Sequence, residues 1–352
     1  MTEHIPKYLK VKNKIKDDIK DGKIVDKLPG ERALAKEFGV AYMTVRKALM
    51  ELQEEGILHK TTTKGTYVSH SKMSPKNTQN IGFFLDASIR QGISSPYYSL
   101  VFKALENIVR KVGFNLLLFS DPEDMHPLKN QKKIDGVIIC SFPRLEKQIQ
   151  EIKKFLPIVL IDNNAADKSI PSVTINNFNA CSESAQYLIS IGHKRIGFIS
   201  GLLDSDICKD RLNGYINGLS IHDFKDDKSL IYKGDYSYES GEKASKYFLS
   251  LPQPPTAIMC ANDSMAIGAM KVIQENKFNI PNDVSVIGFD DIEVSARMFP
   301  ALTTNAAPIE QIAQEAVNIL ISSINGTHLE YQHVILPAKL TLRGSTAPAK
   351  QI

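Results

Sequence analysis

Short apolar runs alternate with longer amphipathic stretches from Ile81 almost to the end of the chain, and this alternation constrains the fold more than any other feature. Short runs rich in Val and Ile are typical of buried strands, whereas apolar residues at helical spacing are typical of helices. Strands are predicted at residues 81–86, 114–120, 136–140, 158–162, 172–175, 195–200, 257–260 and 284–288. Helices are predicted at residues 97–112, 145–155, 179–191, 209–219, 239–250, 264–276 and 309–324.

Strict alternation of strand and helix predicts parallel sheets with helices on both faces. Eight strands over 265 residues favour two doubly wound lobes over a single one. In such folds ligands lie at the carboxyl ends of the strands. The residues that follow each predicted strand are therefore the first candidates for a binding site.

Carboxylates and amides follow three of the predicted strands, in the sequences Asp162-Asn163-Asn164, Asn262-Asp263 and Asp290-Asp291. Brought together in one cleft, such groups suit a ligand rich in hydroxyls. The rings of Tyr97, Tyr98 and Tyr236 could stack on the apolar side of that ligand. Asn and Asp also cap helices routinely, so for Asn262 and Asp263 taken singly, capping is as good an interpretation as ligand contact.

The N-terminal segment, residues 1–70, has a different pattern, and we call it the head. Helical spacing of apolar residues predicts helices at 7–21, 31–38 and 42–55, and Gly39 can take the left-handed conformation of a sharp turn. Residues 57–60 and 66–68 are predicted to form a short hairpin. Two helices joined by a glycine turn are typical of modules that place the second helix in the major groove of DNA.

The charge distribution favours a polyanionic partner for the head. Residues 1–79 hold 16 Lys and Arg against 10 Asp and Glu, whereas the remainder holds 27 against 29. Cations near phosphates release condensed counterions, which favours binding to nucleic acid. A solvated lysine-rich helix would show the same charge, so charge alone leaves both interpretations open.

Thr44, Arg46 and Lys47 of the third predicted helix are expected to face outward. Arg46, one turn into that helix, can reach the O6 and N7 atoms of guanine or a phosphate. Lys64 and Gly65 at the hairpin tip would allow the backbone to approach the adjacent groove closely. For each residue taken alone, a packing domain of three helices without DNA contacts remains the alternative.

Residues 5–69 resemble the winged helix-turn-helix of the GntR family through the motifs LPGERALA, FGV, TVRKAL, EGIL and GTYV. The resemblance implies DNA contacts by Arg32, Tyr42, Thr44, Arg46, Lys64 and Gly65. The family usually has Ser-Arg where this chain has Ala41-Tyr42. Loss of the serine cap costs roughly 1 kcal/mol of helix stability, and loss of the arginine removes a cation. We therefore expect an operator that differs from the commonest family sites.

Residues 80–345 resemble the regulatory domain of the LacI/GalR family, which is itself similar to periplasmic sugar-binding proteins. The resemblance rests on IDGVII, PIVLID, IGHKRIGFISG, DRLNGYINGL, PTAIMCANDSMAIGAM and DVSVIGFDD. It implies an effector site formed by Tyr97, Tyr98, Arg211, Tyr236, Asn262 and Asp290, and the strand-end Asp162 would join them. Arg211 would form paired hydrogen bonds to ligand oxygens, with a surface salt bridge as the alternative. Between Ser120 and Ile134 the helix usual in the family is expected to be truncated or lost.

Together these segments predict an α/β protein in three parts. Residues 1–70 form a winged helix-turn-helix, 71–80 a linker, and 81–345 a two-lobed effector and dimerisation domain of periplasmic-binding-protein-like type I. The combination is similar to that of the arabinose-responsive repressors. We expect a cytoplasmic homodimer that binds double-stranded operator DNA, represses carbohydrate-utilisation genes and leaves the operator when a sugar binds.

Other functional classes have little support in the sequence. No GxSxG, HExxH, GxxxxGKS/T or GxGxxG motif is present and His193 is expected to be structural, so neither an enzyme nor a cofactor is predicted. Cys140, Cys181, Cys208 and Cys260 lack the spacing of a zinc site and are expected to be reduced thiols without a metal. No apolar run approaches the roughly 20 residues of a membrane span. A transport-type binding protein would need an export signal, which we do not find at the N-terminus.

Overall fold

The computed structural model describes residues 6–20, 23–24, 27–54, 57–61, 65–68, 78–86, 91–121, 134–140, 146–163, 165, 167–203, 205–224, 227–327 and 333–350. The chain divides into two compact units, Met1–Thr78 and Gln79–Ile352. Each unit has its own cluster of buried apolar side chains.

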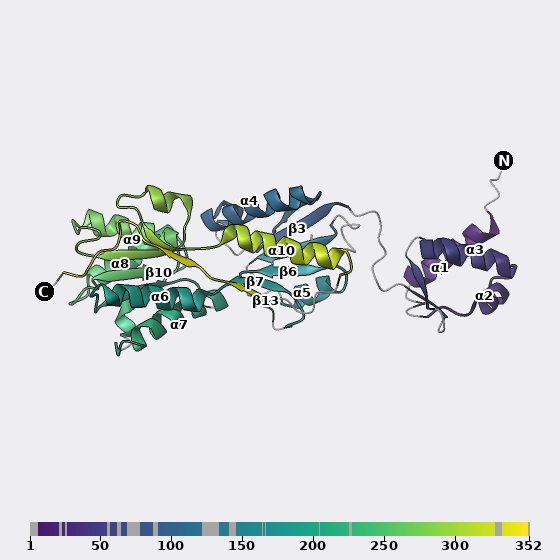
Figure 1. The fold of residues 1–352 in the computed structure, drawn as a ribbon, viewed down its shortest axis with the longest axis horizontal. Helices are drawn as coiled ribbons and strands as arrows, with labels where there is room; N and C mark the ends of the chain where they lie inside the picture. Colours follow the sequence, from purple (N-terminus) through teal and green to yellow (C-terminus); the bar gives the residue numbers. More distant parts are fainter. Residues whose placement is uncertain are drawn as a thin grey trace. The chain divides into compact units, whose positions relative to one another are not determined.

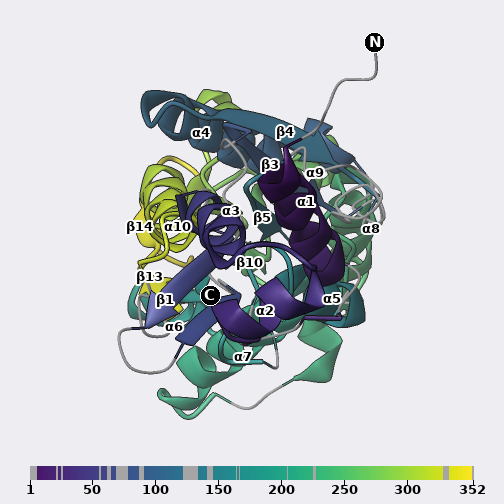
Figure 2. The same ribbon diagram turned by 90° about the vertical axis from the view of Figure 1, so that its right-hand side faces the viewer.

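In the first unit, three helices pack around a small core and are followed by a hairpin (Figure 2). The helices are α1 (Lys7–Lys20), α2 (Glu31–Glu37) and α3 (Tyr42–Glu54), and β1 (Leu58–Thr61) pairs with β2 (Gly65–Val68) in antiparallel fashion. Ile15, Leu34 and Leu52 are fully buried between them. Gly39 has a φ of +59°, as the predicted turn requires. The predicted helices and hairpin of the head are confirmed.

The second unit contains two six-stranded sheets, one in each lobe. The N-terminal lobe has the strand order β13-β7-β6-β5-β3-β4, and all its neighbours are parallel. The C-terminal lobe has the order β14-β12-β11-β10-β8-β9, in which β14 alone is antiparallel to its neighbour. The first sheet is formed by β3 (Asn80–Leu85), β4 (Asn115–Phe119), β5 (Gly136–Cys140), β6 (Ile158–Ile161), β7 (Ser172–Ile175) and β13 (His333–Leu336). The second is formed by β8 (Ile196–Ser200), β9 (Ile231–Lys233), β10 (Ala257–Cys260), β11 (Ser285–Asp290), β12 (Thr303–Ala306) and β14 (Lys339–Thr341).

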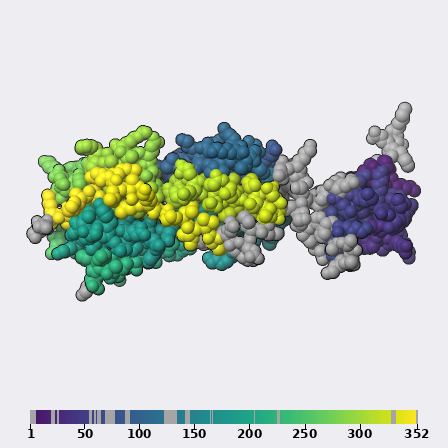
Figure 3. All heavy atoms as spheres, viewed as in Figure 1, coloured from purple at the N-terminus to yellow at the C-terminus, as the bar shows by residue number. Residues whose placement is uncertain are grey.

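Helices cover both faces of each sheet (Figure 1). On the N-terminal sheet, α4 (Pro96–Lys111) and α10 (Ile309–Ile324) lie side by side, and Figure 3 shows their atoms together on one surface. The opposite face packs against α5 (Glu146–Lys153). Phe83 and Phe84 belong to separate buried clusters, because successive side chains of a strand point to opposite faces. The C-terminal sheet lies between the pair α6 (Asn177–Ser190) and α7 (Asp206–Ser220) and the pair α8 (Tyr238–Leu249) and α9 (Asp263–Glu275).

The structure contains four strands that the sequence pattern does not predict, namely β9, β12, β13 and β14. β12 reads TTNA and buries hydroxyls instead of an apolar run, while β9 and β14 have only three residues each. The predicted set of eight strands is therefore incomplete. The α/β class, the parallel sheets and the two lobes are confirmed. Residues 122–133 lie outside the described part of the chain, so the truncated helix there stays a prediction.

The chain of the second unit crosses between its lobes three times, at residues 175–177, 306–309 and 336–339. The Asn176 amide donates to the Leu336 carbonyl at 2.8 Å, so the first and third crossings are hydrogen-bonded to each other. Any rotation of one lobe against the other must bend these segments. Within the ranges described, we find no helix with the length and apolar character needed to cross a membrane.

Candidate effector site and DNA-binding face

The seven predicted effector residues come together where the carboxyl ends of the two sheets face each other. Asp162 follows β6 of the N-terminal lobe, and Asp290 ends β11 of the C-terminal lobe. The two are close enough for Asp162 to raise the pKa of Asp290. Tyr97 and Tyr98 lie in the first turn of α4, Arg211 lies on α7, Tyr236 precedes α8, and Asn262 caps α9.

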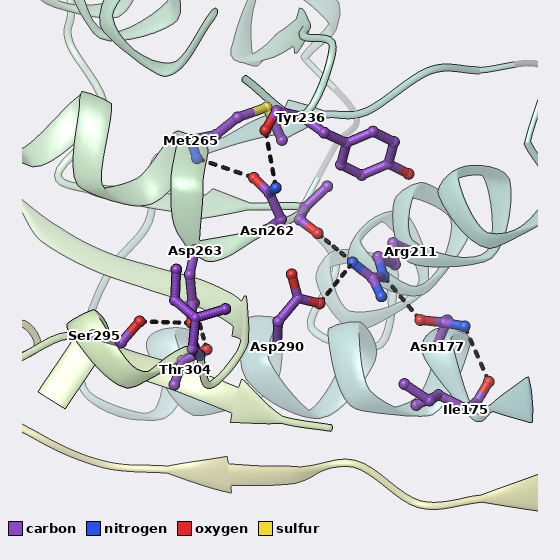
Figure 4. A network of polar contacts seen from close by, with 12 residues as sticks. Ile175, Asn177, Arg211, Tyr236, Asn262, Asp263, Met265, Asp290, Ser295 and Thr304 are labelled. Atoms are coloured by element: carbon purple, nitrogen blue, oxygen red, sulfur yellow. Dashed lines mark hydrogen bonds and ion pairs between the residues drawn. The ribbon is translucent and has the colours of Figure 1, made fainter. Parts of the chain in front are cut away.

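Figure 4 shows Arg211 between Asn177 and Asp290, with dashed lines to both. The Arg211 side chain is only 6% exposed. Nε donates to Asn177 Oδ1 at 2.8 Å, while Nη1 donates to the Ala261 carbonyl and lies 3.7 Å from Asp290 Oδ1. The guanidinium carbon lies 3.6 Å from the centroid of the Phe289 ring. The alternative of a surface salt bridge is wrong for Arg211, because the arginine and Asp290 are both buried.

Two buried carboxyl groups face this single arginine. Burial raises the pKa of Asp162 to about 6, against the lowering effects of Tyr97 and Arg211. Burial also raises the pKa of Asp290 well above its usual value; Arg211 opposes the rise, and the nearby Asp263 and Asp162 add to it. With both acids ionised, the centre of the site carries more negative than positive charge. Hydrogen-bond donors on a ligand would stabilise that charge.

The N-terminal lobe presents polar atoms that lack a hydrogen-bond partner. The Tyr97 hydroxyl and Asp162 Oδ2 are buried and have no partner of good geometry among the described residues. The two groups still lie close enough for each to shift the pKa of the other. The Tyr97 and Tyr98 rings meet edge to face with their centroids 5.2 Å apart. Because buried polar atoms are rarely left without partners, a ligand is the natural partner for these two.

Unusual backbone conformations occur at the same candidate effector site. Asp162, Tyr236 and Asp290 have φ angles of +59°, +66° and +108°. Positive φ is uncommon outside glycine, and such strain gathers at functional sites where the surrounding structure imposes it. A Cβ on Gly201 would overlap the Tyr236 ring, so that ring lies directly against the backbone. No sequence pattern indicates this geometry, and it supports the predicted site independently.

Asn262 and the neighbouring Asp263 both have structural roles (Figure 4). Asn262 Oδ1 accepts from the Met265 amide at 2.9 Å at the start of α9, and Nδ2 donates to the Tyr236 carbonyl at 3.0 Å. The capping interpretation is thus confirmed for Asn262, and ligand contact by its remaining donor stays a prediction.

Asp263 is fully buried, and burial raises its pKa to about 6. Its carboxylate accepts from the Ile292 amide at 2.9 Å and from the Ser295 and Thr304 hydroxyls at 2.6 Å.

Sequence reasoning missed two neighbours of Arg211, namely Asn177 and Phe289. Asn177 Nδ2 donates to the Ile175 carbonyl at 3.0 Å, so this residue links Arg211 to the first crossing between the lobes. Asn177 follows the predicted strand 172–175, so the rule applied to the other strand ends could have found it. Phe289 lies within β11, and an aromatic residue in a buried strand is indistinguishable by pattern from ordinary core.

The remaining sequence candidates are buried away from solvent. All four cysteines are free thiols and buried, and the described residues contain no cluster of three or more His, Cys, Asp or Glu suited to a metal. His193 Nδ1 lies 2.9 Å from Thr256 Oγ1, and Nε2 lies 3.1 Å from both Ser285 Oγ and the Ala347 carbonyl. Burial lowers the pKa of His193. These contacts hold the C-terminal segment against the lobe, which is a structural role.

The head presents most of its predicted DNA contacts to solvent. Arg32, Arg46 and Lys47 are exposed, Tyr42 is 41% exposed, and Thr44 is half-buried. Gly65, at the start of β2, has a φ of +115°, which a side chain would strain. Lys64 lies outside the described residues. The nitrogen of Lys47 lies 4.1 Å from the centroid of the Tyr8 ring, so this cation already has a partner within the head.

Tyr42, which stands where an arginine is usual, lies beside the Glu31 carboxylate. This contact lowers the pKa of Glu31 more than any other. Lys60 Nζ on β1 lies 3.1 Å from Glu31 Oε1, and the positive charge of Arg46 also lowers the pKa of Glu31. One carboxylate at the start of α2 therefore connects α3 to the hairpin.

Known proteins resemble both units of the chain. Residues 7–68 match the bacterial regulatory proteins of the gntR family, and residues 185–346 match the periplasmic binding protein-like domain. The HTH-type transcriptional repressor CytR of Escherichia coli (strain K12) is 33% identical over 262 residues, which are 72% of this chain and 76% of CytR. The Escherichia coli transcriptional repressor ascG is 27% identical with a TM-score of 0.67, over 76% of this chain and 99% of that one. The transcriptional regulator CelR, in complex with cellobiose, shares the fold with a TM-score of 0.71 and 22% identity, over 90% of this chain and 100% of CelR.

Proposed function

Because the chain belongs to the LacI-type family of HTH-type transcriptional repressors and carries a GntR-type head, we propose that it represses carbohydrate-utilisation genes until a sugar binds between its lobes. The observation that carries the proposal is the buried position of Arg211. This residue contacts Asp290 at the end of one lobe's sheet and Asn177 at a crossing between the lobes. A ligand that bonds to Arg211 would therefore act, through Asn177, on the first crossing at residues 175–177, which must bend when one lobe rotates against the other.

The proposed ligand is uncharged and rich in hydroxyls. Asp162 and Asp290 offer carboxylate oxygens, Arg211 offers N–H donors, and Tyr97 and Tyr236 offer rings and hydroxyls. A phosphate or carboxylate on the ligand would add negative charge to a buried place where two acids already face one arginine. CelR, which shares this fold, was solved as a complex with cellobiose. We propose pentoses as the first sugars to test, because the motifs of the sequence resemble those of arabinose-responsive repressors.

The proposed coupling runs through the crossings between the lobes. The Ala307 amide donates to the Asp290 carbonyl at 3.3 Å, which connects the second crossing to the same acid that contacts Arg211. Sugar binding would close the cleft, rotate the lobes and change the spacing of two heads on the operator. Thermodynamic linkage then requires DNA to weaken sugar binding by the factor by which sugar weakens DNA binding.

On the DNA side, α3 is proposed to lie in the major groove with Arg46 at a guanine or a phosphate. The other proposed contacts lie on α2, on α3 and at the hairpin, and they are Arg32, Tyr42, Thr44, Lys47, Lys64 and Gly65. Residues 1–70 would act as the reader and residues 81–345 as the sensor, joined by the linker 71–80. Because an operator lies on the DNA of the cell, we propose that the protein acts in the cytoplasm.

We also propose that two copies pair through the second unit, so that two heads meet a palindromic operator. Exposed aromatic side chains flank the end of α9 and support this proposal. Phe299 is 91% exposed and Phe278 is 41% exposed, and Gln274 in the last turn of α9 donates to the Phe299 carbonyl at 2.9 Å. Exposed apolar groups of this kind commonly mark contacts between subunits. Sedimentation of Phe299→Asp should show a shift toward monomer.

The experiment is a titration of an operator duplex with the protein in the presence of pentoses, hexoses and their phosphates. One uncharged sugar should weaken operator binding, and the phosphorylated sugars should have no effect. Arg46→Ala should lose operator binding and still be stabilised by that sugar against heating. Asp290→Asn should bind the operator and be insensitive to the sugar.

Two results would contradict the proposal. In one, operator affinity does not change with any sugar that binds, which would show that the lobes and the head are uncoupled. In the other, Arg46→Ala or Asp290→Asn loses both activities while still folded, which would show that reading and sensing are not divided between the two units.

A further inference from the structure

The face of α3 that points away from the head's core carries two exposed methionines beside two cations. Met43 is 65% exposed and Met50 is 53% exposed. With Arg46 and Lys47 between them, the spacing of three and four residues places all four side chains on one stripe of the helix. Val45 and Leu52 mark the opposite, buried face.

This stripe borders a shallow hollow of about 420 Å³, lined by Met43, Arg46, Lys47, Met50 and Glu51. The one acid in the hollow is neutralised, because Lys12 Nζ lies 2.6 Å from Glu51 Oε2. The hollow therefore combines an apolar floor with net positive charge. An anionic partner with an apolar group at its surface fits this combination better than an apolar protein face does.

We propose that Met43 contacts the 5-methyl group of a thymine in each operator half-site, next to the base pair or phosphate that Arg46 contacts. Among the bases, only thymine presents a methyl group in the major groove. Residues near the N-terminus of a recognition helix reach the base edges, and Met43 is the second residue of α3. An unbranched, polarizable methionine adapts well to such an apolar contact. The inference rests on the proposed function, because it requires α3 to lie in the major groove.

Met50 provides a matched control on the same helix. It is the same residue type on the same exposed stripe, seven residues further along α3. At that distance from the N-terminus, it should contact the DNA backbone or solvent and no base edge. Substitution of Met50 therefore tests whether any exposed methionine would produce the same result.

The experiment uses the full-length protein and duplexes selected by it from a random pool. Each thymine of a selected half-site is replaced in turn by deoxyuridine, which lacks only the methyl group. At one thymine per half-site the replacement should weaken binding about fourfold, as expected for loss of one buried methyl group. Met43→Ala should bind the thymine duplex more weakly and show no difference between thymine and deoxyuridine. Met50→Ala should keep the full difference.

The outcomes separate this inference from the proposed function. If deoxyuridine is tolerated everywhere while Arg46→Ala still loses the operator, the methionine contact is wrong and the repressor function stands. If the protein selects no duplex, the proposed function fails and the contact fails with it. If Met43→Ala changes sedimentation but not operator affinity, the stripe is a contact between proteins, which also overturns the inference. Thermal unfolding of Met43→Ala, an exposed position, should match that of the wild type.

Discussion

The two lobes bring different kinds of polar groups to the proposed effector site. In the C-terminal lobe, the polar groups of Arg211 and Asp263 are already hydrogen-bonded within the protein. In the N-terminal lobe, the Tyr97 hydroxyl and Asp162 Oδ2 are buried and lack a partner among the described residues. Asp162 and Asp263 make the comparison direct, because burial raises the pKa of each to about 6 although one is well bonded and the other is not.

This difference indicates how the site responds to a ligand. A buried polar group without a partner costs about 1–3 kcal/mol. The polar groups of the C-terminal lobe are held in place by hydrogen bonds within the protein. We call them the C-terminal wall of the site. The N-terminal wall consists of the Tyr97 hydroxyl and Asp162 Oδ2, which gain hydrogen bonds only when a ligand supplies them. Under the proposed function, a ligand bound to the C-terminal lobe would therefore stabilise the closed approach of the N-terminal lobe, which is the differential contact that a change of conformation requires.

The largest expected effect distinguishes the two aspartates by their contribution to stability. Asp263→Ala removes an acceptor that three buried donors share, so it should lower the free energy of unfolding by about 4 kcal/mol. Asp162→Ala removes a carboxylate that has few compensating contacts, so the loss should stay below about 1 kcal/mol. Urea unfolding of both variants measures the difference. Equal losses would show that the two walls are equally well bonded and would remove the basis of the comparison.

The next largest effect concerns ligand binding by Arg211 of the C-terminal lobe. Arg211→Met removes the remaining donors that are proposed to contact the ligand and leaves Asp290 without its cation, so affinity for the inducing sugar should fall about 100-fold. Arg343 offers a matched control, because its Nη2 lies 2.7 Å from the carboxylate of Asp291, the next residue along. Arg343→Met should leave sugar affinity within about twofold of the wild type. Calorimetric titration of both variants tests this, and a comparable loss in Arg343→Met would mean that any nearby arginine matters.

The raised pKa of Asp162 gives a smaller effect that depends on pH. An acid whose pKa rises from 3.8 to about 6 on folding binds more protons in the folded chain. Its contribution to stability is therefore favourable at low pH and is lost as the pH rises through that interval. Between about pH 4 and pH 7, the wild type should lose about 2 kcal/mol of stability relative to Asp162→Asn. A constant difference across this range would place the carboxyl in a more polar environment than its burial indicates.

The same contrast explains how far the sequence could predict the site. Strand ends followed by Asp or Asn predicted that Asp162, Asn262 and Asp290 gather in one place, and the structure brings them together because the carboxyl ends of parallel strands meet at one edge of each sheet. The pattern could not separate a carboxylate that three donors occupy, as in Asp263, from one that is left open, as in Asp162. That distinction depends on Ser295 and Thr304, which lie far along the chain from Asp263.

The fold was predictable where a fully buried apolar run or face decides the element, as in β10 and α10, but not in β13, whose apolar residues are only partly buried. β10 and α10 match the predicted residues because their buried faces are apolar throughout. β12 was missed because its buried side chains are hydroxyls and an amide, stabilised by partners instead of by apolar packing. Buried polar side chains with hydrogen-bond partners are therefore difficult to predict from the sequence, both in strands such as β12 and in the site.

The smallest expected effect comes from removing a single hydroxyl group, that of Tyr97 in the N-terminal lobe. Tyr97→Phe removes a buried group that has no partner, so stability should stay the same or rise by up to about 1 kcal/mol, while affinity for the inducing sugar falls about fivefold. Tyr215 is the matched control in the other lobe, because its buried hydroxyl donates to the Ile196 carbonyl at 2.7 Å. Tyr215→Phe should lose about 1 kcal/mol of stability and leave sugar affinity unchanged. Thermal unfolding and calorimetry of the pair measure both quantities, and if Tyr97→Phe were the less stable of the two, the Tyr97 hydroxyl would already have a partner before any ligand binds.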